Sequence, residues 1–326
     1  MTPELQDKTQ ETYDHKAVKN MADLVAENIR LLQAGKEVNS VIHTDIEDLD
    51  VDFGGLRMGE LVIVGGRPAM GKTQMLVNLA LTISKTMPLL FITLDLSEYL
   101  LTNRFISFVS NVPTNDISQN KLSEEQKEKL ATLDQEFAQR KLFVYEGINN
   151  SITTITSYCL NQIRENGVKV IVLDYLQLIT YPPHRKFRDQ EIGYICMELK
   201  NIAKEHNVCI IVASQLSRSV EQRWGIEGKY PLLSDLRDSG SIEQLADKVL
   251  FIHRPEYYKI FEDERGNNLR GVVEIIVAKN RNGRTGDFKM RRDDLFTNLQ
   301  SEKKDFSFPP DRLMELDSHI ELKTPF

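Results

Sequence analysis

The stretch that most constrains this chain is residues 61–73, where an apolar run leads into a glycine-rich loop and then a helical pattern. The loop reads Gly-x4-Gly-Lys-Thr from Gly66 to Thr73. Glycines let backbone N–H groups point at phosphate oxygens, and the start of the helix adds its positive end. The pattern therefore predicts a loop that binds a nucleoside triphosphate. A glycine turn followed by a chance Lys-Thr pair is the structural alternative.

The residues of this loop have separate expected roles. Lys72 is long enough to reach the outer phosphates, and Thr73 can offer its hydroxyl to Mg²⁺. We therefore expect ATP and Mg²⁺ as cofactors, with the nucleotide in contact with the whole loop. The expected contacts are Gly66, Arg67, Pro68, Ala69, Met70, Gly71, Lys72, Thr73 and Gln74.

The composition excludes several classes of protein. The 326 residues carry a formal net charge of −7, so any DNA contact must come from local Lys and Arg rather than a wholly basic surface. Cys159, Cys196 and Cys209 lack metal-ligand spacing, and buried free thiols are expected. No apolar run approaches the roughly 18 residues of a membrane span, and the polar N-terminus is unlike a signal peptide. We expect a cytoplasmic protein with no membrane partner.

Three segments are expected along the chain. Residues 1–40 would form an N-terminal arm and linker helix, 41–299 the compact domain and 300–326 a C-terminal tail. Within the first segment, residues 16–34 show an apolar stripe at helical spacing. This helix packs either on its own domain or on a neighbouring subunit. Residues 36–50 have the composition of a polar connector.

Apolar runs alternate with helical patterns throughout the compact domain. Continuous apolar runs are typical of parallel strands that are covered on both faces. We therefore expect an α/β fold with a mostly parallel central sheet. The expected strands are Leu61–Val64, Leu89–Leu94, Leu142–Tyr145, Val168–Leu173, Val208–Ala213, Lys248–Ile252 and Val272–Ala278, and the expected helices cover 73–86, 97–110, 123–139, 152–166, 190–206 and 241–246.

Two further polar residues stand where expected strands end. Asp174 follows an apolar run, and a carboxylate at such a tip beside the phosphate loop can anchor Mg²⁺ through the water shell of the metal. A turn or helix-capping aspartate is the alternative. Gln215 follows the run Val208–Ala213, where its amide could sense the γ-phosphate or orient water. Ligands of such sheets bind beyond the carboxyl ends of the strands, which agrees with both positions.

Five separated segments together resemble the motor domain of the DnaB family of replicative ring helicases. They occur in the order of that family and span about residues 42–295. The resemblance implies a RecA-like fold, a six-membered ring and ATP-driven travel along single-stranded DNA. The segments are Gly66–Thr73, Asp174–Leu178, Ser214–Arg223, Ser234–Gln244 and Lys279–Gly283.

The resemblance also implies roles for individual residues. Lys72, Thr73 and Asp174 would hold ATP and Mg²⁺, while Gln215 would link the nucleotide state to the DNA loops. Lys279 and Arg281 would reach into the neighbouring subunit's site, where a cation beside the γ-phosphate stabilises transition-state charge. Each site would then need the next subunit, and such an interface closes as a ring or winds as a filament. Ordinary surface charge is the alternative for these two residues.

DNA contacts are implied in two loops. The first is Tyr181–Asp189, a dense basic patch that includes Arg185, Lys186 and Arg188, although a solvated loop would look the same. The second surrounds Arg237, Asp238 and Gly240, where small residues let backbone N–H groups approach phosphates. Neither loop offers stacked aromatic residues, so we expect grip on the backbone to dominate.

The chain departs from the family pattern in two places. The family usually has a glutamate as base for the attacking water, whereas the strand Leu89–Leu94 here ends in Asp95, about 1.5 Å shorter in reach. We interpret Asp95 as an impaired base, with Glu98 as a possible substitute. Only about 40 residues precede the motor, enough for the linker helix but not for the family's collar domain, which binds primase. Ring assembly would then rest on the linker helix and the motor interface.

The sequence favours an ATP-dependent, ring-forming helicase or translocase on single-stranded DNA, with a DnaB-like role in DNA replication. Its expected partners are further copies of itself, the DNA strand and a possible loader or replication proteins. One alternative is a RecA-like strand-binding ATPase that does not unwind. Another is a nucleotide-gated assembly protein with weak turnover.

Overall fold

The computed structural model describes residues 19–35, 41–181, 188–225, 227–236, 239–263, 265–293 and 299–301. The chain divides into two units, Met1–Val41 and Ile42–Phe326. In the first unit, helix α1 (Met21–Gln33) begins at Asn20, whose side chain accepts a 2.9 Å hydrogen bond from the backbone N–H of Ala22. No residue of α1 is buried, and its apolar stripe is exposed at Met21, Val25, Ile29 and Leu32.

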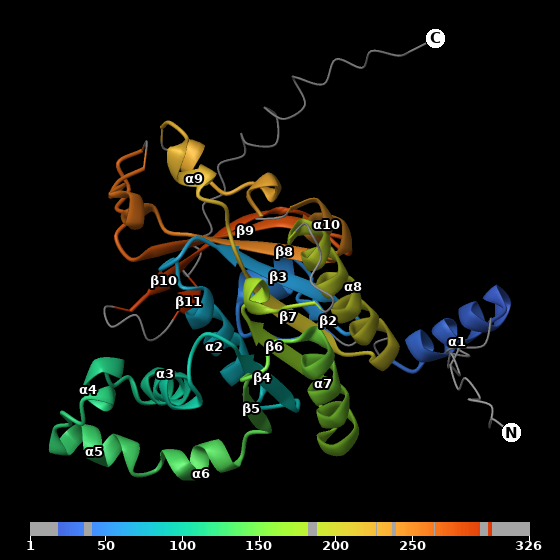
Figure 1. Cartoon of the computed structure of the whole chain (residues 1–326), viewed down its shortest axis with the longest axis horizontal. Coiled ribbons are helices and arrows are strands. Elements are labelled where there is room, and N and C mark those ends of the chain that lie inside the picture. Colours follow the sequence, from blue (N-terminus) through green and yellow to red (C-terminus); the bar gives the residue numbers. More distant parts are fainter. Residues whose placement is uncertain are drawn as a thin grey trace, which may run out of the picture. The chain divides into compact units, whose positions relative to one another are not determined.

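Within its described residues, the second unit is built on a nine-stranded sheet with the order β11-β10-β9-β8-β3-β7-β6-β4-β5 (Figure 1). The six strands from β8 to β5 are parallel, while β9, β10 and β11 extend the sheet in antiparallel fashion. The bounds are β3 (Leu61–Gly66), β4 (Leu89–Thr93), β5 (Leu142–Glu146), β6 (Val170–Asp174), β7 (Cys209–Gln215), β8 (Lys248–His253), β9 (Val272–Asn280), β10 (Gly286–Arg292) and β11 (Leu299–Ser301). The expected mostly parallel sheet is confirmed.

Differences from the expected elements lie at the edges of the domain. Strands β10 and β11 were not anticipated, and β11 extends the sheet to Ser301, past the expected start of a tail. The supposed connector 36–50 contains β1 (Val41–Ile42), which pairs with β2 (Leu56–Arg57), and leads into a short π-helix at Asp48–Asp52. Residues 302–326 lie outside the described part of the chain.

The helices of the second unit are mostly where helical spacing predicts them. The exception is 123–139, which is broken at Ala131 and Thr132 into two short helices. The first of these buries no residue, whereas the second buries Leu133, so the break lets the second piece turn inward. The helices are α2 (Lys72–Ile83), α3 (Glu98–Ser110), α4 (Thr114–Ser118), α5 (Glu124–Leu130), α6 (Leu133–Ala138), α7 (Ile152–Asn166), α8 (Arg188–His206), α9 (Ser219–Gln222) and α10 (Ser239–Leu245), with 3₁₀ turns at Leu176–Leu178, Glu227–Lys229, Leu233–Asp235 and Pro255–Tyr258.

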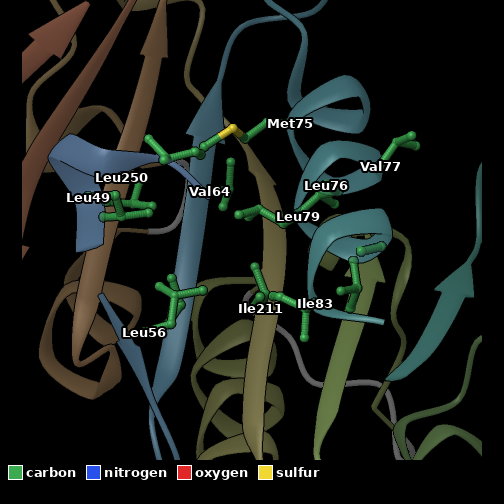
Figure 2. Close-up of a cluster of buried hydrophobic side chains, with 14 of the residues drawn as sticks. Leu49, Leu56, Val64, Met75, Leu76, Val77, Leu79, Ile83, Ile211 and Leu250 are labelled. Carbon is green, nitrogen blue, oxygen red and sulfur yellow. The ribbon is translucent and has the colours of Figure 1, made fainter. Parts of the chain in front are cut away.

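Both faces of the sheet are buried, in two separate hydrophobic clusters. Val62 and Val64 of β3 point into one cluster, and Leu61 and Ile63 point into the other. Helix α2 covers the first face, where Leu76, Leu79 and Ile83 lie close to the strands (Figure 2), and residues of α7 and α8 belong to the second cluster. Because successive side chains of a strand point to opposite faces, both faces need apolar residues and the runs are continuous. The three cysteines are buried and free, as expected.

Candidate functional site

Two residues of the glycine-rich loop have left-handed backbone conformations. The backbone of Ala69 has φ +62° and that of Gly71, which precedes the first residue of α2, has φ +98°. Both values lie in the left-handed region, which glycine adopts at low cost but which is unfavourable for an alanine. At the end of β3, a Cβ on Gly65 would lie 2.7 Å from the ring of Phe251, so this position must be glycine for β8 to pack beside it. The loop is thus fixed at the start of a buried helix.

A cavity of about 520 Å³ opens beside this loop at the carboxyl ends of the parallel strands. Strand ends, the turns that follow them and two helices all contribute to it, which is the expected place for a ligand in such a sheet. The lining residues are Pro68, Ala69, Gly71, Lys72, Thr73, Gln74, Asp95, Arg104, Asp174, Tyr175, Gln215 and Arg254. The strand-tip residues named from the sequence therefore meet in one place.

Lys72 folds back over the loop. Its Nζ donates hydrogen bonds to the backbone carbonyls of Gly66, at 2.8 Å, and Arg67, at 3.1 Å. Burial lowers the pKa of Lys72 to about 8, although Asp174 opposes this shift. An ammonium held this way is poorly solvated, and anionic phosphate oxygens would compensate that cost.

Thr73 and Asp174 join the start of α2 to the tip of β6. The Thr73 hydroxyl donates a 2.7 Å hydrogen bond to Oδ2 of Asp174. Burial raises the pKa of Asp174, whose residue is 4% exposed, while the bond from Thr73 and the charge of Lys72 act in the opposite direction. A hydroxyl and a carboxylate are hard oxygen donors that suit Mg²⁺.

The rest of a magnesium coordination sphere would come from outside the protein. The described residues include no group of three or more His, Cys, Asp or Glu side chains that could hold a metal ion by themselves. Mg²⁺ usually keeps several waters and is bound through one or two protein oxygens together with substrate phosphates. The Thr73–Asp174 pair therefore fits a metal that arrives with a nucleotide.

Asp95 and Glu98 differ in their placement. Asp95 lines the cavity two residues after β4, and its charge acts on both Lys72 and Asp174. Glu98 is the first residue of α3 and is not among the lining residues; its backbone N–H donates a 2.8 Å hydrogen bond to Glu146. The geometry therefore favours Asp95 as the group that would face an attacking water.

Gln215 lines the cavity at the tip of β7, and Gln177 braces it. The side chain of Gln177 accepts a 3.0 Å hydrogen bond from the Gln215 backbone N–H and donates a 2.9 Å bond to the hydroxyl of Ser214. The segment that follows β6 is thereby fastened to the end of β7. The contact therefore joins the tips of two strands at the cavity.

Three residues of the loop do not line the cavity. The Gly66 carbonyl is occupied by Lys72, and Met70 is buried with 2% exposure. Arg67 points away: its Nε contacts Glu221 at 2.9 Å and its guanidinium donates to the carbonyl of Leu216 at 2.8 Å. These three residues therefore support the loop on the side that faces away from the cavity.

Arg104 and Arg254 line the cavity without having been anticipated. Arg254 donates a 2.8 Å hydrogen bond to the carbonyl of Ala69. It follows β8 directly, so its position as a polar residue after an apolar strand could have predicted it from the sequence. Arg104 lies within α3, and its charge acts on Asp174. No pattern in the sequence marks it.

Lys279 and Arg281 lie far from the cavity of their own chain. The register pairs Val62 with Lys248 and Lys248 with Asn280, so the end of β9 is level with the start of β3. Four residues of strand, about 13 Å, separate that level from Gly66. Lys279 donates to the backbone carbonyl of Glu243, and Arg281 to that of Gln244, at the end of α10.

The expected DNA contacts are only partly within the described residues. Arg185, Lys186, Arg237 and Asp238 lie outside them. Arg188 begins α8, pairs with Glu191 and donates hydrogen bonds to the carbonyls of Gln177 and Ile179, so its guanidinium braces the start of the first loop. Gly240 is exposed in α10, and a Cβ there would meet no atom within 4 Å.

Comparison with known proteins identifies the family. The DnaB-like helicase C terminal domain family matches residues 41–301. The chain belongs to this family. The match covers the whole described sheet, including the strands that carry the cavity.

Relatives and solved structures agree with this membership. The replicative DNA helicase DnaB of Rickettsia typhi is 32% identical, covering 93% of this chain and 66% of that protein. The Geobacillus stearothermophilus protein of the same name is 34% identical, covering 90% of this chain and 65% of that protein. This DnaB-like chain thus spans about two thirds of the length of these relatives.

Among solved structures, one described as an ATPase domain superimposes with a TM-score of 0.79 at 26% identity, covering 88% of this chain and 100% of that one. A structure described as a DnaB-like replicative helicase and its interactions with primase gives a TM-score of 0.75 at 26% identity, covering 88% of this chain and 68% of that one. The RecA-like fold is thus confirmed. No helix in the described ranges is long and apolar enough to cross a membrane.

Proposed function

We propose that this chain is the motor of a hexameric, ring-forming helicase that hydrolyses ATP and travels along single-stranded DNA. The placement of Lys279 and Arg281 carries the proposal. They lie at the opposite end of the sheet from their own cavity, so they suit the cavity of a neighbouring copy. Such a head-to-tail contact closes into a ring when its rotation closes.

Each residue of the cavity then has a part in hydrolysis. Lys72 holds the outer phosphates, and Thr73 and Asp174 hold Mg²⁺, which neutralises charge on the phosphates. Asp95 orients the attacking water, and Gln215 contacts the γ-phosphate. Arg281 and Lys279 of the adjacent copy stabilise the charge that develops on the transferred phosphoryl group.

Membership of the family supports the proposed substrate and partners. Single-stranded DNA is the proposed substrate along which the motor moves. Two loops would bind it: one contains Arg185, Lys186 and Arg188, and the other contains Arg237, Asp238 and Gly240. The names of the relatives suggest a role in DNA replication. Contacts with a loader or other replication proteins belong to the same proposal.

An unwinding assay on forked DNA tests this function. The protein with ATP and Mg²⁺ should separate the fork, whereas Lys72→Ala should not, and single strands should raise ATP turnover. Turnover stimulated by single strands without unwinding would instead support a RecA-like strand-binding ATPase. Nucleotide binding with neither activity would contradict both and leave a nucleotide-gated assembly protein.

A further inference from the structure

Among the described residues, Trp224 is the most exposed large apolar side chain. It is the single tryptophan of the chain and is 95% exposed. Burying an aromatic side chain of this size removes a large apolar area from water, so leaving it exposed forgoes that stabilisation. Trp224 follows α9 in the segment Leu216–Leu236, which connects β7 to α10 and is called here the 216–236 segment.

Hydrogen bonds and an ion pair fix the part of the 216–236 segment that carries Trp224. Lys229 donates 2.7 Å hydrogen bonds to the backbone carbonyls of Glu221 and Arg223, on the near side of Trp224. Arg223 pairs with Asp235, and the two ends of the segment meet in an antiparallel bridge between Leu216 and Leu236. The exposed indole is therefore carried by a turn whose two sides are tied together.

The same segment is tied to the phosphate loop. The Arg67 side chain, 7% exposed, contacts the carboxylate of Glu221 at 2.9 Å and the carbonyl of Leu216 at 2.8 Å. Glu221 lies in α9, just before Trp224. If the phosphate loop moves when nucleotide binds, the buried Arg67 guanidinium can displace Glu221 and, with it, the segment that carries Trp224.

The charge of the segment favours a base rather than a phosphate as the partner of Trp224. Its three basic residues, Arg218, Arg223 and Lys229, are balanced by three acidic ones, Glu221, Glu227 and Asp235. Phosphate attraction is consequently weak here, whereas an indole offers a face on which any base can stack for about 1–3 kcal/mol. The segment ends at Leu236, directly before the second proposed DNA loop.

We propose that Trp224 stacks on an unpaired base of the bound single strand, and that the Arg67–Glu221 contact makes this stacking depend on the nucleotide. The inference rests on the proposed function and adds an aromatic contact to the expected grip on the DNA backbone. The contact is insensitive to base sequence, as a translocating motor requires.

Tryptophan fluorescence tests the stacking directly, because the chain has one tryptophan. Oligo(dT) added with Mg²⁺ and a non-hydrolysable ATP analogue should quench the emission, and an abasic strand of equal length should not. Anisotropy of a labelled strand should show that Trp224→Ala binds about 5- to 150-fold more weakly, with Trp224→Phe between it and the wild type. Tyr99→Ala, which removes an aromatic residue of α3 that is 60% exposed, should bind as the wild type does.

Glu221→Gln tests the link to the nucleotide. It should keep the quenching by DNA but lose the difference between nucleotide-free and analogue-bound protein. A strand that binds by anisotropy without quenching, or equal affinity of Trp224→Ala, would overturn the inference and leave the proposed function intact. A change of native mass in Trp224→Ala would also overturn it, since the indole would then contact another copy. Absence of any strand binding by the wild type would instead contradict the proposed function.

Discussion

The hydroxyl of Thr73 donates a 2.7 Å hydrogen bond to Asp174, and the two residues are 101 positions apart in the sequence. One stands in the first turn of α2 and the other at the tip of β6, so packing of the helix on the sheet brings both oxygen donors to one side of the cavity. The protein part of the proposed magnesium site is thereby already assembled.

Asp174→Asn should lower ATP turnover by about 100-fold or more, because the amide keeps the size but loses the charge that attracts Mg²⁺. Burial raises the pKa of Asp174, so its ionised form is costly in the nucleotide-free protein and the variant should melt at the same or a higher temperature near pH 7. Steady-state turnover and thermal melting measure the two effects. Wild-type turnover in the variant would contradict the assignment of Asp174.

Lys72→Met should abolish ATP binding and yet stabilise the nucleotide-free protein near pH 7, by on the order of 1–3 kcal/mol. The reason is that burial lowers the pKa of Lys72 to about 8, below its ordinary value of 10.5. Below pH 8 the lysine is charged in both the folded and unfolded states, and the folded state bears the full cost of burial. Between pH 8 and about 10.5 the folded protein loses the proton first, so the wild type gains stability and the advantage of the variant shrinks.

Denaturant unfolding of both proteins at several pH values measures this difference. Lys85→Met, which replaces an exposed lysine, is the matched control and should not stabilise the nucleotide-free protein. A variant advantage that grew with pH would contradict the lowered pKa of Lys72.

Asp95→Asn should reduce turnover by about 100-fold, whereas Glu98→Gln should leave it within about two-fold of the wild type. Asp95 lines the cavity and Glu98 does not. Single-turnover hydrolysis by the two variants, with nucleotide affinity measured separately, distinguishes the residues. Turnover that survived Asp95→Asn but was lost in Glu98→Gln would assign the base to Glu98.

Most of the site could be predicted because its residues follow one rule. Lys72, Asp174 and Gln215 each follow a continuous apolar strand, and parallel strands bring their carboxyl ends to one edge. Arg254 follows β8 in the same way and could have been found by the same rule. Arg104 could not, because a basic residue within a helix has many possible orientations and only tertiary packing selects the cavity.

The sheet was predictable in its centre and not at its edge. Parallel strands read as continuous apolar runs, whereas β10 alternates, with Phe288 and Met290 buried and the other residues of the strand partly or fully exposed. This period-two pattern was present in the sequence, but it is short and follows a charged turn. The break between α5 and α6 had no signal of its own, because neither glycine nor proline lies between Leu130 and Leu133.

Val25→Asp combined with Leu32→Asp should reduce or abolish oligomers. Both side chains belong to the exposed apolar stripe of α1, at 47% and 65% exposure, and the family resemblance suggests that this helix docks on an adjacent copy. Asp23→Ala, on the same helix, is the matched control. Native mass measurement should show lower-order species for the double variant, as for removal of residues 1–36. Unchanged assembly in both would show that the motor interface suffices.

The central claim is that one copy supplies the nucleotide cavity and the next supplies Arg281. Lys72→Ala and Arg281→Ala should each be inactive alone, with Arg164→Ala, which removes an exposed surface arginine, as an active control. When the two inactive variants are mixed and reassembled in equal amounts, about a quarter of the interfaces combine an intact cavity with an intact Arg281. The account predicts that ATP turnover returns to about that fraction of the wild-type rate. No recovery on mixing, with mixed oligomers confirmed by mass, or full activity of Arg281→Ala alone, would contradict it.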